Sequence, residues 1–214
     1  MNFMIFNDLF ENSFVISLSH RLDRRVKMEK KLTKHNLSYN FFDAVNGHEL
    51  DYSGPLLKGE EGVRQSHIKL FEQCLANGSK SLLIFEDDIE FSDDFHNQLN
   101  LALESLPETT EMFYLGGSHH QKPVFFKNNV YKITHTYTAQ ALWISGSIFE
   151  KLKHAIESNV HFPVDVVYAM MQPQLNAFAV YPHLVWQAKD YSDIQNKFVD
   201  YDFLKKEFVR FEKN

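Results

Sequence analysis

The chain alternates short apolar runs with segments in which apolar residues recur every three or four positions. The runs predict buried strands, and the recurring positions predict amphipathic helices. The expected strands are Phe14–Leu18, Tyr39–Phe42, Ser81–Asp88, Met112–Leu115, Thr138–Ser145 and Phe178–Val185. The expected helices are Arg24–His35, Gly62–Leu75, a helix capped by Ser92 that ends before Pro107, and Ser147–Ser158. Strands that alternate with helices predict an α/β fold whose sheet is mostly parallel and covered by helices on both faces.

Length and composition fit one domain. The chain has 214 residues, of which 44% are hydrophobic, enough for a single large α/β core. We therefore expect one domain over residues 1–214. The formal net charge of -6 argues against nucleic acid as a partner, because the phosphate backbone needs a basic surface. Cys74 is the one cysteine, so no internal disulfide can form, and its apolar setting predicts a small buried side chain.

The two ends of the chain bear on its location. Asp8 and Glu11 stand where a signal peptide would be apolar, and no apolar run approaches the ~18 residues of a spanning helix. A cytoplasmic protein is expected. In a predicted C-terminal helix, Phe203, Phe208 and Phe211 fit one apolar stripe. The basic residues between them could lie peripherally against an anionic membrane surface.

Three adjacent acids, Glu86, Asp87 and Asp88, end the apolar run in the segment SLLIFEDDIEF. Clustered carboxylates repel one another and resist desolvation, so they are expected where the strand leaves the sheet, near a cation. The carboxyl end of a parallel strand is also where open α/β sheets bind ligands. In an extended strand, Glu86 and Asp88 face one side and Asp87 the other. Same-side carboxylates suit Mn²⁺ or Mg²⁺, and a merely solvated acidic strand end is the alternative.

Motifs spread over most of the chain resemble glycosyltransferase family 25, the group of bacterial lipopolysaccharide and lipooligosaccharide glycosyltransferases and of collagen galactosyltransferase catalytic domains. In order they are FVISLSHRLDRRVKMEKKL, FFDAVNGHEL, GEEGVRQSHIKLFEQCL, LLIFEDDIEF, FYLGG, TYTAQALWISGSIFEKL, FPVDVV and YPHLVWQAKDYSDI. Their order and separations make the resemblance specific. The chain departs from the pattern at Val63, where many members have a cysteine, and it is short for the family.

The resemblance implies a single GT-A-type nucleotide-sugar-binding domain whose acidic motif holds Mn²⁺ or Mg²⁺ against the diphosphate of a sugar nucleotide. Glu86 and Asp88 would hold the metal, and Asp87 would contact a ribose hydroxyl or a metal-bound water. The implied reaction is an inverting hexose transfer. UDP-galactose is the best candidate donor, and a saccharide or glycolipid of the lipopolysaccharide or capsule type is the expected acceptor.

Basic residues follow the first expected strand. Arg21 and Arg25 lie where the first helix opens, and there they would reach the diphosphate or the rim of the uracil site, helped by the positive end of the helix dipole. A solvated basic helix start is the alternative. Asp43 follows the second expected strand, where the family places contacts to the nucleotide. Its role is carried over by analogy alone.

Two further motifs are expected to hold the donor. Ser66 and His67 would contact the sugar nucleotide or brace the acidic loop, although a lone histidine is more often a structural hydrogen-bonding group. Gln187 and Ser192 belong to the late motif of the family and are expected to bind the donor as well.

The resemblance also implies a third metal ligand near the C-terminal end of the domain. Metal sites of this fold usually complete their shell there, and Asp193 or His183 could do so. Water is the other possibility. Asp193 could instead simply cap a turn.

Asp165 is the candidate general base. An inverting transfer needs a carboxylate or histidine within hydrogen-bond reach of the attacking hydroxyl, opposite the leaving diphosphate. Apolar residues follow Asp165, so its charge must lie at a cleft edge or be paired. The alternative is an N-cap for a helix that runs to Met171. In that case the base would be Asp193 or His67.

Two other classes of function share these features. A catalytically inactive module that binds a sugar nucleotide would carry the same motifs, and hydrolysis or transfer with Mn²⁺ would distinguish the enzyme from it. A metal-dependent phosphohydrolase or receiver domain is the weaker alternative. Neither an obvious lysine-bearing strand nor an N-terminal nucleophilic aspartate accompanies the acids.

Overall fold

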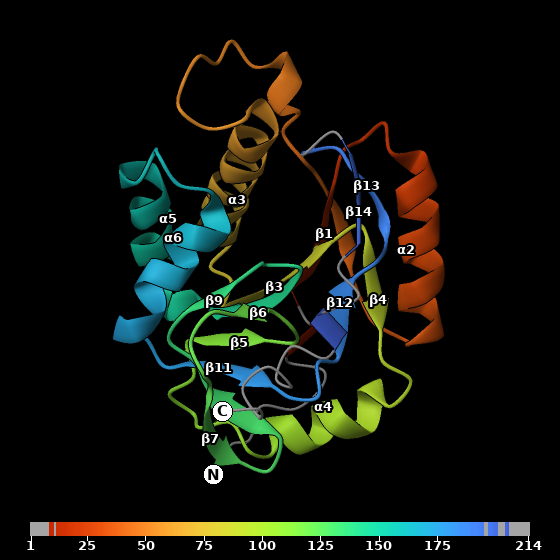
Figure 1. Cartoon of the computed structure of the whole chain (residues 1–214), viewed down its shortest axis with the longest axis vertical. Helices are drawn as coiled ribbons and strands as arrows, with labels where there is room; N and C mark the ends of the chain where they lie inside the picture. The colour runs from red at the N-terminus through yellow and green to blue at the C-terminus, as the bar shows by residue number, and fades with distance from the viewer. Residues whose placement is uncertain (1–8, 11, 195–196, 201–203, 206–214) are drawn as a thin grey trace.

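Helices pack on both faces of one eight-stranded sheet (Figure 1). The computed structural model describes residues 9–10, 12–194, 197–200 and 204–205. The strands of the sheet follow the order β2-β1-β3-β10-β5-β11-β8-β7. In that order they are Asn40–Asp43, Ser13–Ser17, Ser81–Glu86, Ala141–Ser145, Met112–Tyr114, Ala177–Val180, Val130–Lys132 and Val124–Lys127.

The helices divide between the two faces of the sheet. Helices α3, α5 and α6 cover one face, and α2 and α4 cover the other (Figure 1). In chain order, α2 to α6 are Leu22–Lys34, Lys58–Ala76, Phe95–Leu103, Phe149–Ser158 and Val164–Met171. Alternate residues of β3 serve the two faces: Leu82 and Ile84 join one apolar core, and Leu83 and Phe85 join the other. The predicted α/β class with helices on both faces is confirmed.

Strand direction explains where a site can form. Strands β1, β2 and β3 are parallel neighbours, and β5 and β11 run in the same direction, so their carboxyl ends meet at one edge. The predicted mostly parallel sheet is confirmed, although β10 and β8 run the opposite way. Because β10 is reversed, the loop that precedes it reaches this same carboxyl edge.

Short strands outside the main sheet complete the fold. Strand β4 (Ile89–Phe91) pairs with β12 (Val185–Gln187), and β6 (Ser118–His119) pairs with β9 (Thr136–Tyr137). Strand β13 (Asp190–Ser192) pairs with β14 (Lys197–Val199), and this β13–β14 pair lies beside α2 in Figure 1. Three-residue 3-10 helices lie at Gly47–Glu49, Gly146–Ile148 and Gln172–Gln174.

Several predicted boundaries are wrong for local reasons. Strand β3 ends at Glu86, because the next two residues form a turn. Ser92 is not an N-cap, since α4 begins at Phe95 with Asp94 in the N-cap position. Strand β10 begins at Ala141 rather than at residue 138, which has a φ of 66° and so cannot continue a strand. Helix α3 starts at residue 58, one turn before the predicted Gly62.

Two further predictions concern the termini and the cysteine. The expected C-terminal stripe of Phe203, Phe208 and Phe211 lies outside the described residues. Over the part of the chain that is described, no helix is long and apolar enough to cross a membrane. Cys74 is a buried free thiol, as predicted.

Candidate active site

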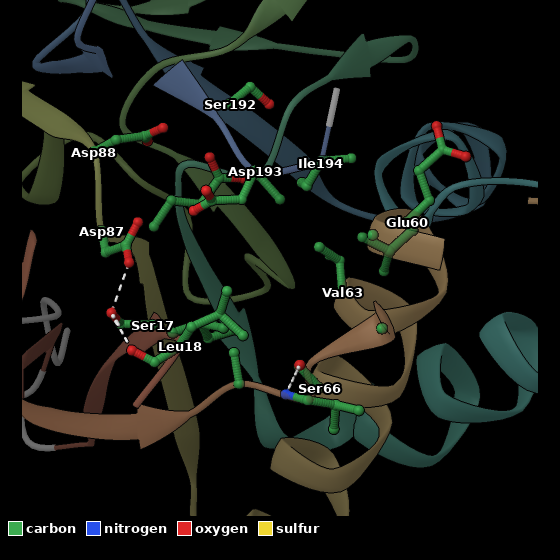
Figure 2. A pocket seen from close by; sticks show the side chains of 18 of the residues that line it. Ser17, Leu18, Glu60, Val63, Ser66, Asp87, Asp88, Ser192, Asp193 and Ile194 are labelled. Atoms are coloured by element: carbon green, nitrogen blue, oxygen red, sulfur yellow. Dashed lines mark hydrogen bonds between the residues drawn. The ribbon is translucent and has the colours of Figure 1, made fainter. Parts of the chain in front are cut away.

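A cavity of about 280 Å³ opens at the carboxyl edge of the sheet, with α2 and α3 contributing to its walls. Figure 2 shows Asp87, Asp88 and Asp193 on one side of the cavity, facing Val63 and Ser66 of α3 on the other. Most of the predicted site residues line it: Ser66, His67, Glu86, Asp87, Asp88, Asp165, Gln187, Ser192 and Asp193.

The acidic turn consists of Glu86, the last residue of β3, with Asp87 and Asp88. Asp87 accepts hydrogen bonds on both oxygens, from Ser17 Oγ at 2.6 Å and from Arg24 Nη1 at 2.6 Å. Asp88 Oδ2 lies 3.5 Å from Arg24 Nη1, whereas its Oδ1 is buried with no hydrogen-bond partner among the described residues. The strand ends before Asp88, so the same-side geometry predicted from an extended strand does not apply. The turn nevertheless brings all three carboxylates to the cavity.

Arg24 is the site residue that the sequence analysis missed. Its guanidinium contacts Asp87, Asp88 and the carbonyl oxygen of Tyr191. Burial opposes the charge of Arg24, but the charges of Asp87 and Asp88 outweigh burial and raise its pKa. The cavity therefore contains a buried, permanently charged arginine beside its acids.

Helical spacing is the signal that could have found this arginine. Arg24, Met28 and Leu32 recur at four-residue intervals and form the buried face of α2. Arg21, the N-cap residue of α2, and Arg25, one position after Arg24, do not line the cavity. Of the three arginines at this end of α2, the one in register with apolar positions is the one that points into the protein.

The other charged candidates near α2, Arg21, Arg25 and Asp43, do not line the cavity and form ion pairs at its edge or beyond it. Arg21 pairs with Asp23 and with Asp193. Arg25 pairs with Asp43 at 2.5 Å and also donates to a backbone carbonyl of β1. The Asp43 side chain is 72% exposed. Because Arg21, Arg25 and Asp43 do not line the cavity, they could contact a donor only at its rim.

Two acids of the turn, Glu86 and Asp88, have raised pKa values. Burial and the charge of Asp88 raise the pKa of Glu86 to about 8, while a 2.7 Å hydrogen bond from Gln187 Nε2 opposes the rise. Burial also raises the pKa of Asp88 to about 6, although the charge of Arg24 lowers it. Burial and the neighbouring acid therefore both disfavour the ionised form of Glu86, and a bound cation would favour it.

These residues fit a divalent cation. Glu86 and Asp88 supply hard oxygen ligands, and the unpartnered Asp88 Oδ1 lacks the hydrogen bond that a buried carboxylate normally has. Within the described ranges, no three acidic, histidine or cysteine side chains converge as a metal cage. Mg²⁺ commonly takes one or two carboxylates and fills its other positions with waters and substrate phosphates. The two carboxylates of Glu86 and Asp88 match this preference of Mg²⁺.

The two candidates for a third ligand differ in position. Asp193 lines the cavity and forms an ion pair with Arg21. His183 does not line it: its Nε2 lies 3.1 Å from His119 Nε2, and its Nδ1 lies 2.8 Å from the carbonyl oxygen of Leu204. Burial lowers the pKa of His183 to about 4. The geometry favours Asp193 over His183 for this position.

Ser66 and His67 line the cavity but are also hydrogen-bonded into the fold. Ser66 Oγ donates to the Gly62 carbonyl at 2.7 Å and accepts from the Val45 amide at 2.8 Å, so it braces the loop after β2. His67 Nδ1 lies 2.8 Å from the Tyr168 hydroxyl, and burial lowers its pKa to about 4. These contacts give both residues a structural role, whether or not they also touch a ligand.

Acid should destabilise the fold through His67. The unfolded histidine takes up a proton near pH 6.5, whereas the buried ring takes one up only near pH 4. The contribution of His67 to the free energy of unfolding is therefore fully present above pH 6.5 and is lost as the pH falls from 6.5 toward 4. Between pH 7 and pH 5, the free energy of unfolding measured in urea should fall by about 2 kcal/mol more for the parent than for His67→Gln. His154→Gln, at an exposed histidine of α5, is the control and should follow the parent. Equal losses in parent and His67→Gln would contradict the assignment.

Asp165 lies in the first turn of α6 and lines the cavity. The N-cap of α6 is Pro163, so Asp165 is not the N-cap residue, although its carboxylate does accept from a first-turn amide of a helix that ends at Met171, as that alternative predicted. Its Oδ2 accepts from the Thr138 amide at 3.2 Å, and its Oδ1 accepts from the Val166 amide at 2.9 Å. Thr138 has a φ of 66°, which is uncommon for a β-branched residue, and Asp165 helps to hold it. Each carboxylate oxygen retains a second lone pair that can accept a proton.

Glycines bring α3 close to the rest of the cavity wall. A Cβ on Gly62 would lie 2.6 Å from the Val45 carbonyl oxygen and 2.7 Å from the Gly47 amide. A Cβ on Gly59 would lie 2.8 Å from Ile194 Cα, just beyond β13. Any side chain at these positions would force α3 away from its neighbours. The glycines of the GEEG motif therefore set the width of the cavity.

The sheet, the acidic turn after β3 and the cavity beside it define an α/β protein with a ligand-binding edge at the carboxyl ends of its parallel strands. Glycosyltransferase family 25 (LPS biosynthesis protein) matches residues 10–164, and the chain belongs to this family. The matched span includes the acidic turn and Arg24. It ends one residue before Asp165, so the placement of Asp165, Gln187, Ser192 and Asp193 rests on the structure.

Relatives share part of their length with this chain. The probable inactive glycosyltransferase 25 family member 3 of Rattus norvegicus is 33% identical in an alignment of 129 residues, which covers 50% of this chain and 23% of the rat protein. Procollagen galactosyltransferase 1-A of Xenopus laevis is 28% identical in an alignment of 189 residues, which covers 76% of this chain and 31% of its own length. The chain thus spans less than a third of either relative. The solved structure of A197 from STIV covers 87% of this chain and 91% of its own, with a TM-score of 0.51 and 12% identity, and is similar in fold alone.

Proposed function

We propose that this chain transfers a hexose from a sugar nucleotide to a saccharide acceptor, with inversion at the anomeric carbon. The observation that supports this most directly is the cavity that brings Glu86, Asp88 and Asp165 to one edge of the sheet. Two mutually repelling carboxylates favour a bound cation there, and a third carboxylate lies beside them as a base. Membership of a glycosyltransferase family is consistent with this chemistry.

Each acid has a distinct part in the proposal. Glu86 and Asp88 hold Mn²⁺ or Mg²⁺ near the donor diphosphate, with Asp193 as the proposed third carboxylate. When bound, the metal neutralises charge that builds on the departing diphosphate. Asp87, fixed by Ser17 and Arg24, holds the turn in place and presents its remaining lone pairs to the donor. Asp165 takes the proton of the attacking hydroxyl as its oxygen bonds to the anomeric carbon and the bond to the diphosphate breaks.

Other lining residues orient these groups. Gln187 donates to Glu86 and so fixes that carboxylate toward the cavity. Ser192 lies in β13 at the cavity wall, which supports a proposed contact with the donor. Ser66 and His67 brace the opposite wall through the loop after β2 and through α6. The donor would therefore lie between the β13–β14 pair and α3.

The substrate assignments are proposals supported by the relatives. UDP-galactose is the proposed donor, since two Xenopus laevis relatives are named procollagen galactosyltransferases. A saccharide or glycolipid of the lipopolysaccharide or capsule type is the proposed acceptor, in line with the description of the family. We place the reaction in the cytoplasm, with peripheral contact at a membrane surface where a glycolipid acceptor is held. Nucleic acid is not a proposed partner.

A catalytically inactive sugar-nucleotide-binding module is the second candidate. The rat relative is named probable inactive. In this chain, moreover, Arg24 already compensates part of the charge of Asp87 and Asp88. The two candidates differ in turnover and agree in donor binding.

The test combines binding and turnover on the purified chain. UDP-galactose, UDP-glucose and UDP-N-acetylglucosamine are compared with Mn²⁺ or with EDTA, by thermal shift and by release of UDP with and without saccharide acceptors. We expect Mn²⁺-dependent stabilisation by one donor, because a ligand that binds only the native state raises its stability, together with release of UDP. Stabilisation without any release would favour the binding module. Neither effect with any donor would refute both candidates.

A further inference from the structure

Arg24 joins three separate segments of the chain at the cavity. Its Nη1 donates to Asp87 Oδ1 at 2.6 Å and lies 3.5 Å from Asp88 Oδ2, while its Nη2 donates to the carbonyl oxygen of Tyr191. The residue is only 6% exposed. One guanidinium therefore connects α2, the acidic turn and the β13–β14 pair, and Figure 2 shows the acids of that turn beside Asp193, which follows β13.

The charge of the cavity wall is otherwise negative. Among the described residues that line the cavity, Arg24 is the only lysine or arginine. The acids that line it are Glu60, Glu86, Asp87, Asp88, Asp165 and Asp193. Poorly solvated carboxylates repel one another strongly because the surrounding protein screens less than water does. The fixed positive charge of Arg24 offsets part of this repulsion, because it contacts both Asp87 and Asp88.

We propose that Arg24 is a positioning residue that acts as the built-in counter-cation of the acidic turn, in place before any divalent cation binds. This inference rests on the metal site of the proposed function. Arg24 and the cation are both positive and both interact with Asp88, so each reduces the stabilisation that the other gives to the acidic turn. Without Arg24, the native state should bind the cation more tightly and depend on it more for stability.

A merely structural arginine would behave differently, and the chain offers one for comparison. Arg64 is as buried as Arg24, at 7% exposed, and its Nε donates to Glu61 Oε2 at 2.8 Å within α3. It also donates to the backbone carbonyl of Ile156, and it does not line the cavity. Losing either arginine should lower the melting temperature. Only the loss of Arg24 should change the response to a cation.

The experiment measures thermal unfolding of the full chain with and without MnCl₂, and Mn²⁺ affinity by titration, with no donor sugar present. Relative to the parent, Arg24→Met should melt lower without metal, gain at least about 5 °C more from Mn²⁺, and bind Mn²⁺ about 10-fold more tightly or better, as removal of a nearby positive charge requires. Arg64→Met should melt lower but keep the parent's Mn²⁺ shift. Arg24→Lys, which retains the charge, should keep the parent's Mn²⁺ affinity.

An Mn²⁺ shift in Arg24→Met that is equal to or smaller than the parent's would overturn the proposal, as would no Mn²⁺ effect in either protein. Should Arg24→Met not fold, Arg24→Gln supplies the same comparison, because glutamine is also uncharged but its amide can hydrogen-bond in a polar site. Since no transfer is measured, a chain that binds Mn²⁺ but turns over no donor would refute the proposed function and leave this test intact.

Discussion

Asp165→Asn is expected to lower sugar transfer by about 100-fold or more, the usual cost of losing a general base. The asparagine keeps the side-chain volume and one acceptor oxygen for the Thr138 amide, so the free energy of unfolding should change by about 1 kcal/mol or less. Mn²⁺-dependent binding of the donor should persist because Asp165 is not a proposed metal ligand, although loss of its charge near Glu86 should weaken Mn²⁺ binding. Single-turnover transfer and calorimetric donor binding, measured on the same preparations, check both expectations.

Asp94→Asn is the matched control for Asp165→Asn. Asp94 also begins a helix, as the N-cap of α4, and accepts side-chain hydrogen bonds from Asn97 and Gln98, but it does not line the cavity. This variant should transfer sugar at the parent rate. Transfer at the parent rate by Asp165→Asn would exclude Asp165 as the base. Asp193, which also lines the cavity, would then be the candidate base.

Asp88→Asn is expected to abolish Mn²⁺-dependent binding of a uridine diphosphate sugar. Removing a partner one shell beyond a metal ligand typically costs 10–100-fold in affinity, so losing a ligand should cost at least about 100-fold. The fold should survive and even gain stability without metal, because the substitution removes the charge that raises the pKa of Glu86. Calorimetry with and without Mn²⁺ measures the affinity, and thermal unfolding measures the stability.

Glu90→Gln controls for the loss of an acid in the same segment. Glu90 lies in β4, pairs with Lys31 at 2.9 Å and does not line the cavity. Its variant should bind the donor as the parent does. Unchanged affinity of Asp88→Asn in the presence of Mn²⁺ would mean that the acidic turn does not hold the metal.

The two substitutions also separate the enzyme from the inactive module. In an enzyme, Asp165→Asn removes turnover and keeps binding, whereas Asp88→Asn removes both. In a binding module, Asp88→Asn still removes metal-dependent binding, but Asp165→Asn keeps donor binding and has no turnover to lose. A parent that binds donor without turnover, with that pattern in the variants, would assign the role of a module.

Apolar patterning along the chain determines the layered architecture. In β3 every side chain from Leu82 to Phe85 is apolar, which indicates a strand buried on both faces, and the structure confirms two cores on its two sides. The change from that run to three acids also locates the edge where a ligand can bind. These features depend on periodicity and composition over a few neighbouring residues, and such local signals can be read from sequence.

Tertiary structure alone decided which charges meet. Arg24 lies 63 positions from Asp87 and 167 positions from Tyr191, so nothing local to α2 indicates that they touch. The reversed direction of β10 likewise brings the Thr138 loop to the carboxyl edge, within reach of Asp165. Several strand orders and directions would bury the same apolar faces of the sheet. Strand direction and long-range pairing therefore depend on how whole elements pack. Local patterns predict each strand and helix, and only their packing shows that an arginine on the buried face of α2 lies against the acids at the end of β3.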